Sequence, residues 1–217
     1  MEDLSFNTIK ENILNRFKND KKFKIASYVL SVFLIFGLGY LSYYQFIYKP
    51  ENEKSKTAYW KGLNFAVNDS IPDPAIKELK KVVNKYDGKD GAEIAKFVLA
   101  RQYMRKGKFQ KAISILVDTD FSDTYLSCFK IGLTGDCYSD LKKYSKAYDY
   151  YLEAAELNEG NDFTSPRYLF KAAKCAEKLN NFKEASDLYK KIKANYRTFE
   201  KENIDKHIAK ASKTKVK

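Results

Sequence analysis

Histidine and cysteine, on which most metal sites and many catalytic sites depend, are scarce in this chain. Its 217 residues include one histidine, His207, and three cysteines, Cys128, Cys137 and Cys175. No two cysteines form a C-x-x-C pair, and Cys128 and Cys137 would lie about 13 Å apart along one helix, too far for a disulfide. We therefore expect no metal and no cofactor, and we interpret the cysteines as small apolar side chains in helix packing.

The usual signatures of catalysis are also missing. The sequence has no Gly-rich phosphate loop, no metal-ligand spacing, and no nucleophile beside a base in a readable motif. Scattered Asp and Glu residues belong to no such motif. We therefore predict a protein that is not an enzyme and has no small-molecule substrate.

One stretch, residues 25–48, contains no Asp, Glu, Lys, Arg or His. As a helix it would be about 36 Å long, against about 30 Å for the hydrocarbon core of a bilayer. A signal peptide has a shorter apolar region and a small-residue cleavage site, and a soluble helix would carry a polar stripe. The stretch therefore predicts a single uncleaved membrane anchor. Ser31, Gly37 and Gly39 are its candidate positions for packing against another membrane helix.

Charge is distributed unevenly around this stretch. The formal net charge is +12, of which the lysine-rich residues 190–217 supply +7. Because this charge lies in a terminus and not on an arginine and aromatic face, we interpret it as a solvated tail and do not expect nucleic acid as a partner. The basic cluster of residues 18–24 places the N-terminus in the cytoplasm and the C-terminal domain in the periplasm of a two-membrane cell. The inverse topology, with the basic tail on ribosomes or lipid, is an alternative.

A pattern of one aromatic residue, an alanine three residues later and a large residue four further recurs after residue 57. The copies are Phe109, Ala112, Leu116; Tyr144, Ala147, Tyr151; Phe182, Ala185, Tyr189; and a degenerate Pro72, Ala75, Leu79. This alternation and its spacing of 35 to 38 residues are typical of the tetratricopeptide repeat, a pair of antiparallel helices. An unrelated antiparallel helix bundle is the alternative.

We therefore predict an all-α protein with one membrane helix and a solenoid of three or four repeats closed by a capping helix, with Ile204, Ile208 and Ala211 on its inner face. The predicted parts are a cytoplasmic basic arm (1–24), in which Leu4, Ile9, Ile13, Leu14 and Phe17 recur at helical spacing, the membrane helix (25–48), a linker (49–56), the repeats (57–198), and the capping helix with the basic tail (199–217).

In such a solenoid the first helix of each pair lines a concave groove. The predicted groove residues mix aromatic rings with charges of both signs, which suits an extended peptide or a partner helix. They are Trp60, Phe97, Arg101, Met104, Arg105, Phe129, Asp136, Asp140, Arg167, Phe170 and Lys174, with Ser139 and Lys178 beside them. Ordinary packing between repeats is the alternative for each aromatic ring.

Two segments carry a resemblance to a known family. The segment NDFTSPRYLFKAAKCAEKLNNFKEASDLYKKIKANY (161–196) and the junction YYQFIYKP (43–50) resemble the YfgM-like tetratricopeptide proteins, especially their Bacteroidota-type forms. The resemblance implies a single-span protein of the inner membrane, associated with the SecYEG translocon and engaging exported polypeptides or periplasmic chaperones. An envelope scaffold for division or outer-membrane assembly is the alternative function.

Overall fold

The computed structural model describes residues 6–68, 71–196, 199 and 203–213, and every regular element in these ranges is a helix. The chain divides into two compact units, Met1–Glu51 and Asn52–Lys217, which are described separately. Leu4 of the predicted arm and the last four residues of the predicted tail lie outside the described residues. The all-helical fold predicted from the periodicity is confirmed.

The first unit contains α1 (Phe6–Asn19), α2 (Lys21–Tyr43), the π-helical turn η1 (Tyr44–Tyr48) and the start of α3 (Lys49–Ala58). The helix that begins at Lys21 is long and apolar enough to cross a membrane, by length and composition. None of its most apolar part is buried in the protein. The predicted anchor, residues 25–48, corresponds to most of α2 together with η1.

The three small polar or glycine positions of α2 do not share one face. The Ser31 hydroxyl donates to the backbone carbonyl of Ser27 at 2.8 Å, so its hydrogen bond is made within the helix. Gly37 and Gly39 both face open space. Two residues of an α-helix turn through about 200°, so these glycines lie on nearly opposite sides. Packing of a membrane helix against any of the three stays a prediction.

The predicted linker, residues 49–56, is helical. From Asn52 onward it belongs to the second unit, where it packs against the start of α6 (Asp90–Arg105). The Asn52 amide donates to the Asp90 carboxylate at 2.8 Å and accepts from the Asp90 backbone N–H at 2.9 Å. A Cβ at Gly91 would lie 2.0 Å from the Ser55 carbonyl oxygen, so only glycine allows this approach.

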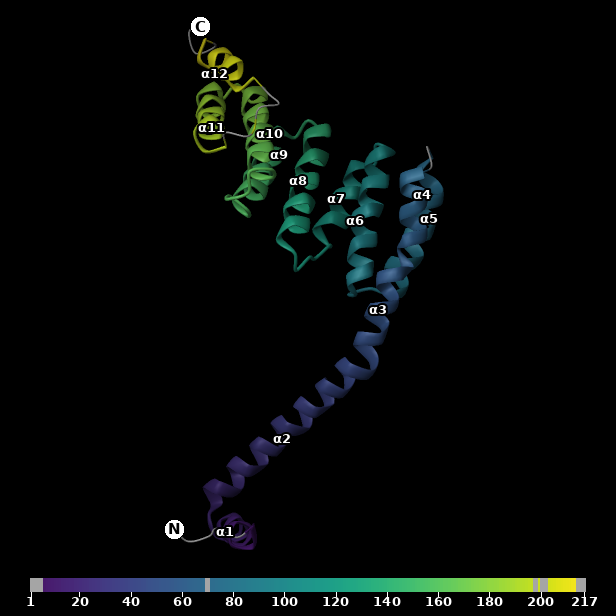
Figure 1. Cartoon of the computed structure of the whole chain (residues 1–217), viewed down its shortest axis with the longest axis vertical. Helices are drawn as coiled ribbons and strands as arrows, with labels where there is room; N and C mark the ends of the chain where they lie inside the picture. The colour runs from purple at the N-terminus through teal and green to yellow at the C-terminus, as the bar shows by residue number, and fades with distance from the viewer. Residues whose placement is uncertain (1–5, 69–70, 197–198, 200–202, 214–217) are drawn as a thin grey trace. The chain divides into compact units, whose positions relative to one another are not determined.

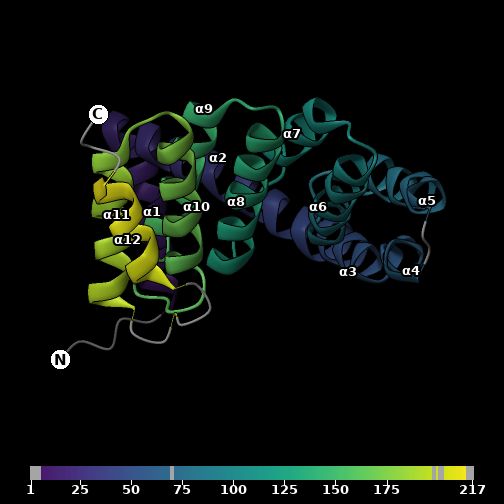
Figure 2. The same ribbon diagram turned by 90° about the horizontal axis from the view of Figure 1, so that it is seen from above.

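The second unit is a row of helices in which each packs against the next along the chain (Figures 1 and 2). Besides α6, they are α4 (Trp60–Asn68), α5 (Pro72–Lys85), α7 (Phe109–Val117), α8 (Thr124–Asp140), α9 (Tyr144–Glu156), α10 (Ser165–Lys178), α11 (Phe182–Asn195) and α12 (Ile204–Lys213). The pairs α4–α5, α6–α7, α8–α9 and α10–α11 correspond to the four repeats of the sequence pattern.

The small and large alternation fills the core as predicted. All four pattern alanines, Ala75, Ala112, Ala147 and Ala185, are 0% exposed. Their large companions on α5, α7, α9 and α11 are buried beside them. The predicted capping helix is also present, because Ile204 and Ala211 of α12 are buried against the preceding pair and Ile208 is packed against it.

Two glycines on α8 admit tyrosine rings from the next helices. A Cβ at Gly132 would lie 2.0 Å from Tyr168 of α10, and one at Gly135 would lie 2.7 Å from Tyr151 of α9. The two rings stack with their centroids 6.4 Å apart. Glycine therefore sets how closely α9 and α10 pack on α8.

The turns inside three repeats share a left-handed residue. Gly107, Lys142 and Asn180 have φ values of 67°, 56° and 60°, each between the two helices of its repeat. Glycine adopts this conformation freely and asparagine tolerates it, whereas lysine pays a steric cost of about 1–2 kcal/mol. Lys142 is thus the strained member of the set.

All three cysteines are buried and free of disulfides. Burial, reinforced by nearby carboxylates, raises the pKa of the Cys137 thiol to about 12. Burial also raises the pKa of Cys128. This confirms the interpretation of the cysteines as packing residues.

Lys96 of α6 is a buried charge, with its side chain 8% exposed. Its amine lies 3.0 Å from Glu93, 3.0 Å from Asp118 and 3.3 Å from Asp87. Burial opposes its charge, but hydrogen bonds with Asp118 and Glu93 outweigh burial, so the pKa of Lys96 lies above its ordinary value. The ammonium therefore ties α6 to the loop that follows α7.

Replacing Gly132 with alanine should lower the free energy of unfolding by about 1–3 kcal/mol, because the new methyl group overlaps Tyr168. Alanine's better helix propensity should offset about 1 kcal/mol of this loss. Gly160→Ala is the control, since a Cβ there meets nothing within 4 Å. Urea unfolding of the full chain in detergent measures both. Equal stability of the two variants would contradict this packing.

Lys96→Gln should destabilise the repeat unit by about 1–3 kcal/mol, because Glu93, whose side chain is 13% exposed, loses its charged partner. Lys81→Gln removes an exposed ion pair with Glu78 and should cost less, since solvent screens that pair. The thermal unfolding midpoints of the two variants measure the difference. A midpoint for Lys96→Gln no lower than that for Lys81→Gln would mean that the buried Lys96–Glu93 pair contributes nothing.

Candidate functional site

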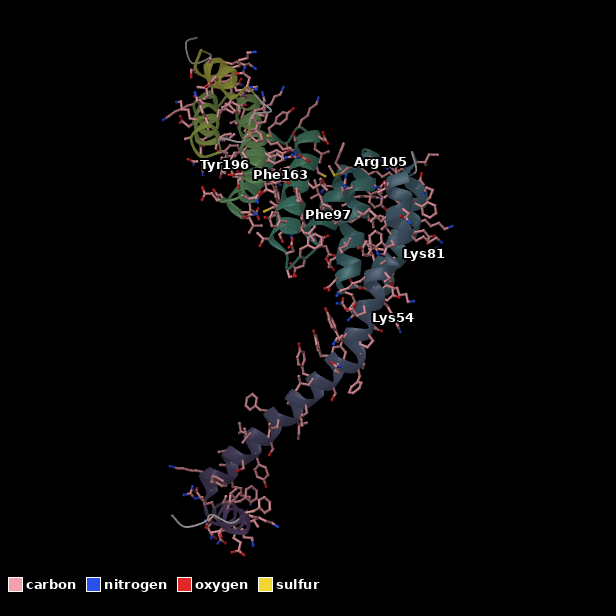
Figure 3. The ribbon with its side chains drawn as sticks, viewed as in Figure 1. Lys54, Lys81, Phe97, Arg105, Phe163 and Tyr196 are labelled. Atoms are coloured by element: carbon pink, nitrogen blue, oxygen red, sulfur yellow. The ribbon has the colours of Figure 1, made fainter. Side chains whose placement is uncertain are left out.

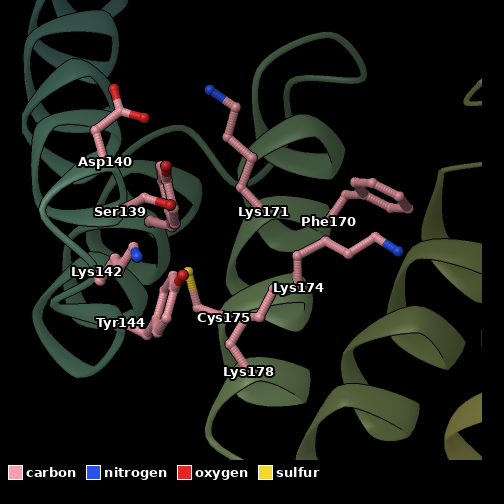
Figure 4. A pocket seen from close by; sticks show the side chains of 10 residues that line it. Ser139, Asp140, Lys142, Tyr144, Phe170, Lys171, Lys174, Cys175 and Lys178 are labelled. Carbon is pink, nitrogen blue, oxygen red and sulfur yellow. The ribbon is translucent and has the colours of Figure 1, made fainter.

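A hollow of about 460 Å³ lies between α8 and α10, the first helices of two successive repeats (Figure 4). The end of α8, the turn after it, and one face of α10 form its walls, and two tyrosines of α9 complete it. Its lining residues are Ser139, Asp140, Lys142, Tyr144, Tyr151, Phe170, Lys171, Lys174, Cys175 and Lys178.

Positive charge dominates the rim of this hollow. Four lysines line it against one carboxylate, Asp140. Three of the lysines follow one another along α10 at helical spacing, and Figure 4 shows them across from Ser139 and Asp140 of α8. The field in the hollow therefore favours an anion.

One of these lysines, Lys171, is held by internal contacts. Its amine lies 2.6 Å from the Asp136 carboxylate, which also accepts a hydrogen bond from the Tyr151 hydroxyl at 2.6 Å. The same amine lies over the Tyr151 and Tyr168 rings, 5.4 Å and 5.7 Å from their centroids. Lys171 and Asp136 therefore offset each other, and the Lys174 amine in turn lies 3.8 Å from the Glu177 carboxylate, so the exposed charge at the rim comes mainly from Lys142 and Lys178.

Lys174 connects the hollow to the capping helix. Its amine lies 3.0 Å from Nδ1 of His207 and 5.3 Å from the centroid of the Phe170 ring. The His207 ring lies 5.1 Å from the ring centroids of Phe170 and of Tyr189. The single histidine thus packs α12 onto α10. Among the described residues, no three His, Cys, Asp or Glu side chains come close enough to hold a metal ion.

Two ionisable groups of the hollow, Cys175 and Tyr151, have raised pKa values. Burial, with a contribution from Asp136, raises the pKa of the Cys175 thiol to about 11. Burial and the Asp136 carboxylate also raise the pKa of the Tyr151 hydroxyl above its ordinary value. At neutral pH both groups stay protonated, so neither supplies a ready nucleophile or base.

The structure brings one group of the predicted groove residues together. Asp140, Phe170 and Lys174 line the hollow, as do Ser139 and Lys178. Asp136 lies beside it, engaged by its two internal partners.

Two more predicted residues belong to the same pair of repeats. Phe129 is half-buried in the surrounding core, while Arg167 is exposed with its guanidinium 4.5 Å from the centroid of the Phe163 ring. Neither lines the hollow.

The other predicted groove residues lie on α4 and α6 and do not line the hollow. Figure 3 labels two of them, Phe97 and Arg105. Met104 is half-buried in the core, and Phe97 packs edge-on against Phe121 at 5.9 Å. Arg101 is exposed.

Two of these residues, Arg105 and Trp60, contact nearby residues of the repeat unit. Arg105 donates to the Ala66 carbonyl at 3.3 Å and to Gln102 at 2.9 Å. Trp60 is 52% exposed and stacks on Tyr59. Packing between repeats, the alternative for each aromatic ring, describes Phe97 and Phe129 well.

Several lining residues escaped the sequence prediction, namely Lys142, Tyr144, Tyr151, Lys171 and Cys175. Lys171 stands three residues before Lys174 and seven before Lys178, so helical spacing alone would have placed it on the same stripe. No local sequence pattern predicts the left-handed turn at Lys142 or the packing of the Tyr151 ring against Gly135 of α8.

Models of the tetratricopeptide repeat match residues 132–161 and 167–198. These matches cover much of α8–α9 and α10–α11, the two pairs that form the hollow. No curated protein sequence matches the chain.

Solved structures share the fold at low sequence identity. The MamA protein is 20% identical with a TM-score of 0.61, over 75% of this chain and 84% of that one. A structure from Podosopora anserina, whose own TPR-like repeats are nearly identical to one another, is 12% identical to this chain. Its TM-score is 0.60, over 76% of this chain and 87% of that one. RapI in its apo form is 15% identical with a TM-score of 0.60, over 71% of this chain and 46% of RapI. The chain is therefore an all-helical protein that carries tetratricopeptide repeats and has their solenoid fold.

Proposed function

We propose that this chain is a membrane-anchored protein–protein interaction module whose hollow between α8 and α10 binds an acidic segment of a protein partner. The observation that carries the proposal is that Lys142, Lys174 and Lys178 line one hollow together with Phe170 and Tyr144. Lysine amines attract carboxylates, and the rings give an extended chain apolar surface to cover. Tetratricopeptide repeats are typically scaffolds for such contacts.

The backbone at Lys142 supports this assignment. Lysine occupies the left-handed position where the equivalent turns have Gly107 and Asn180, two residues that adopt this conformation at lower cost. Strained residues cluster at functional sites, because there the side chain is worth its conformational cost. Lys142 lines the hollow, which is where such a cost would be compensated by ligand binding.

Anchoring is the second part of the proposal. We propose that α2 and η1 cross the cytoplasmic membrane once, with the N-terminus in the cytoplasm and the repeats in the periplasm. The basic cluster before α2 supports this orientation. A tethered module meets neighbouring membrane partners at high effective concentration, so weak contacts in the hollow suffice.

We further propose that the partner is the SecYEG translocon together with exported polypeptides or periplasmic chaperones. The resemblance of residues 161–196 and 43–50 to YfgM-like proteins supports this role. Exposed groove residues beyond the hollow, such as Trp60, Arg101 and Arg167, would extend the contact along a bound chain. One side of α2, at Gly37 or at Gly39, would contact a translocon helix within the bilayer, since the two glycines lie on nearly opposite sides of α2.

A fluorescent peptide rich in Glu and Phe should bind the full chain in detergent and lose affinity when rim lysines are removed. Lys142→Asn and Lys178→Gln should each weaken binding about 2- to 5-fold, the effect of one solvent-exposed ion pair. Fluorescence anisotropy measures the change, and a peptide with Lys in place of Glu should not bind.

Lys111→Gln on α7 is the matched control, because it removes the same charge from an exposed position outside the hollow. An equal loss in all three variants would reduce the effect to net charge. Unfolding of Lys142→Asn should be no easier than that of the wild type, since asparagine tolerates the turn.

The full chain, expressed at its native level and purified in mild detergent, should carry translocon subunits with it. Replacing residues 25–48 by an unrelated membrane helix of equal length should weaken this association if α2 makes the contact. Quantitative mass spectrometry of the purified complexes reads both results. Absence of translocon subunits from the wild-type preparation would sink the translocon role, while the peptide-binding result would stand separately.

A further inference from the structure

The first unit bends sharply at Asp20. Asp20 ends α1 and caps α2, since its side chain accepts hydrogen bonds from the backbone N–H groups of Lys22 at 2.9 Å and Phe23 at 3.1 Å. In Figure 1, α1 is seen end-on while α2 is seen along its length, so the two axes lie far from parallel. The cap makes this break a built feature of the chain, because Asp at an N-cap starts a new helix.

The apolar face of α1 has little protein to cover it. Phe6, Ile9, Ile13 and Leu14 recur at helical spacing and are exposed, Phe6 by 80%. The fifth apolar residue, Phe17, turns toward α2 and meets the Tyr28 ring edge-on at 5.7 Å. Tyr28 lies beyond the basic start of α2, in its apolar part. The apolar face of α1, which includes Phe17, therefore points in the direction in which α2 continues.

Positive charge surrounds this face. Residues 6–24 contain six Lys and Arg against two Asp and Glu, a net charge of +4. One of the two carboxylates, Asp20, is occupied as the cap of α2. The Lys24 amine lies 5.6 Å from the centroid of the Phe17 ring, at the junction of the two helices. A basic helix with an uncovered apolar face, joined at a bend to a membrane span, is complementary to an anionic bilayer surface.

We infer that α1 lies flat in the headgroup region of an anionic lipid bilayer, with Phe6, Ile9, Ile13 and Leu14 inserted toward the acyl chains and its polar face in water. This placement rests on the proposed crossing of the membrane by α2. It assigns α1 a lipid surface as its partner and makes the first unit an anchor with two contacts to the membrane. Lysines at the bend then hold the charged lipid headgroups around the start of α2.

Single cysteines carrying an environment-sensitive fluorophore test the placement in the full chain. Ile13→Cys reports the apolar face, Asn15→Cys reports the opposite face, and Leu34→Cys reports the middle of α2. The native cysteines are buried, so the introduced thiol is the one that labels. The protein is reconstituted in phosphatidylcholine vesicles with and without phosphatidylglycerol, and a lipid-borne quencher measures contact with the bilayer.

In vesicles with phosphatidylglycerol, quenching at residue 13 should exceed that at residue 15 several-fold, and the excess should shrink without the anionic lipid. If residue 34 is quenched while residues 13 and 15 are equally exposed to water, α1 does not lie in the bilayer although α2 crosses it. If residues 13 and 15 are both shielded from water without lipid quenching, a protein or a second copy covers α1 instead. If residue 34 is in water, the anchor and the placement of α1 both fail.

Discussion

Close approach of helices at small side chains is the constraint on which the repeat unit depends. The four alanines of the pattern are fully buried, and each lies where one helix meets the next. A larger side chain there would push the pair apart and uncover the large residues that fill the space between repeats. Because each repeat completes its core on its neighbour, the effect would spread along the row. The same constraint explains why α12 is needed, since α11 would otherwise expose an apolar face.

The hollow is a product of this packing. Gly132 and Gly135 admit the rings of Tyr168 and Tyr151, and the Tyr151 hydroxyl reaches Asp136. Asp136 in turn pairs with Lys171, and Lys178 at the end of α10 faces solvent. Each buried polar group there has a partner, as the interior demands. The exposed charge of Lys142 and Lys178 lies at the rim, where water solvates it and where the proposed ligand would bind.

The described part of the first unit does not bury its apolar side chains in a core of its own, so water is a poor solvent for its surface. Its apolar residues on α1 and α2 are exposed in the chain itself, and the repeat packing that covers the second unit has no counterpart there. A bilayer would supply the missing contacts for both helices. The proposed anchor and the proposed site then work together, since tethering compensates for modest affinity at an open, solvated hollow.

The sequence by itself determined the elements whose signal is local and periodic. The alternation of small and large residues around Ala112, Ala147 and Ala185 predicted the repeats, and an uncharged apolar run predicted the helix that includes most of α2. Several of the predicted groove residues, including Phe170 and Lys174, do meet at the hollow, because helical spacing places them on one face of α10. Tertiary structure alone decided that Asp136 is occupied internally, that Lys142 takes a left-handed turn beside the hollow, and that residues 52–56 pack against α6. These depend on contacts between residues about 15 to 38 positions apart, or on a strained turn, and no periodicity within one helix records such contacts.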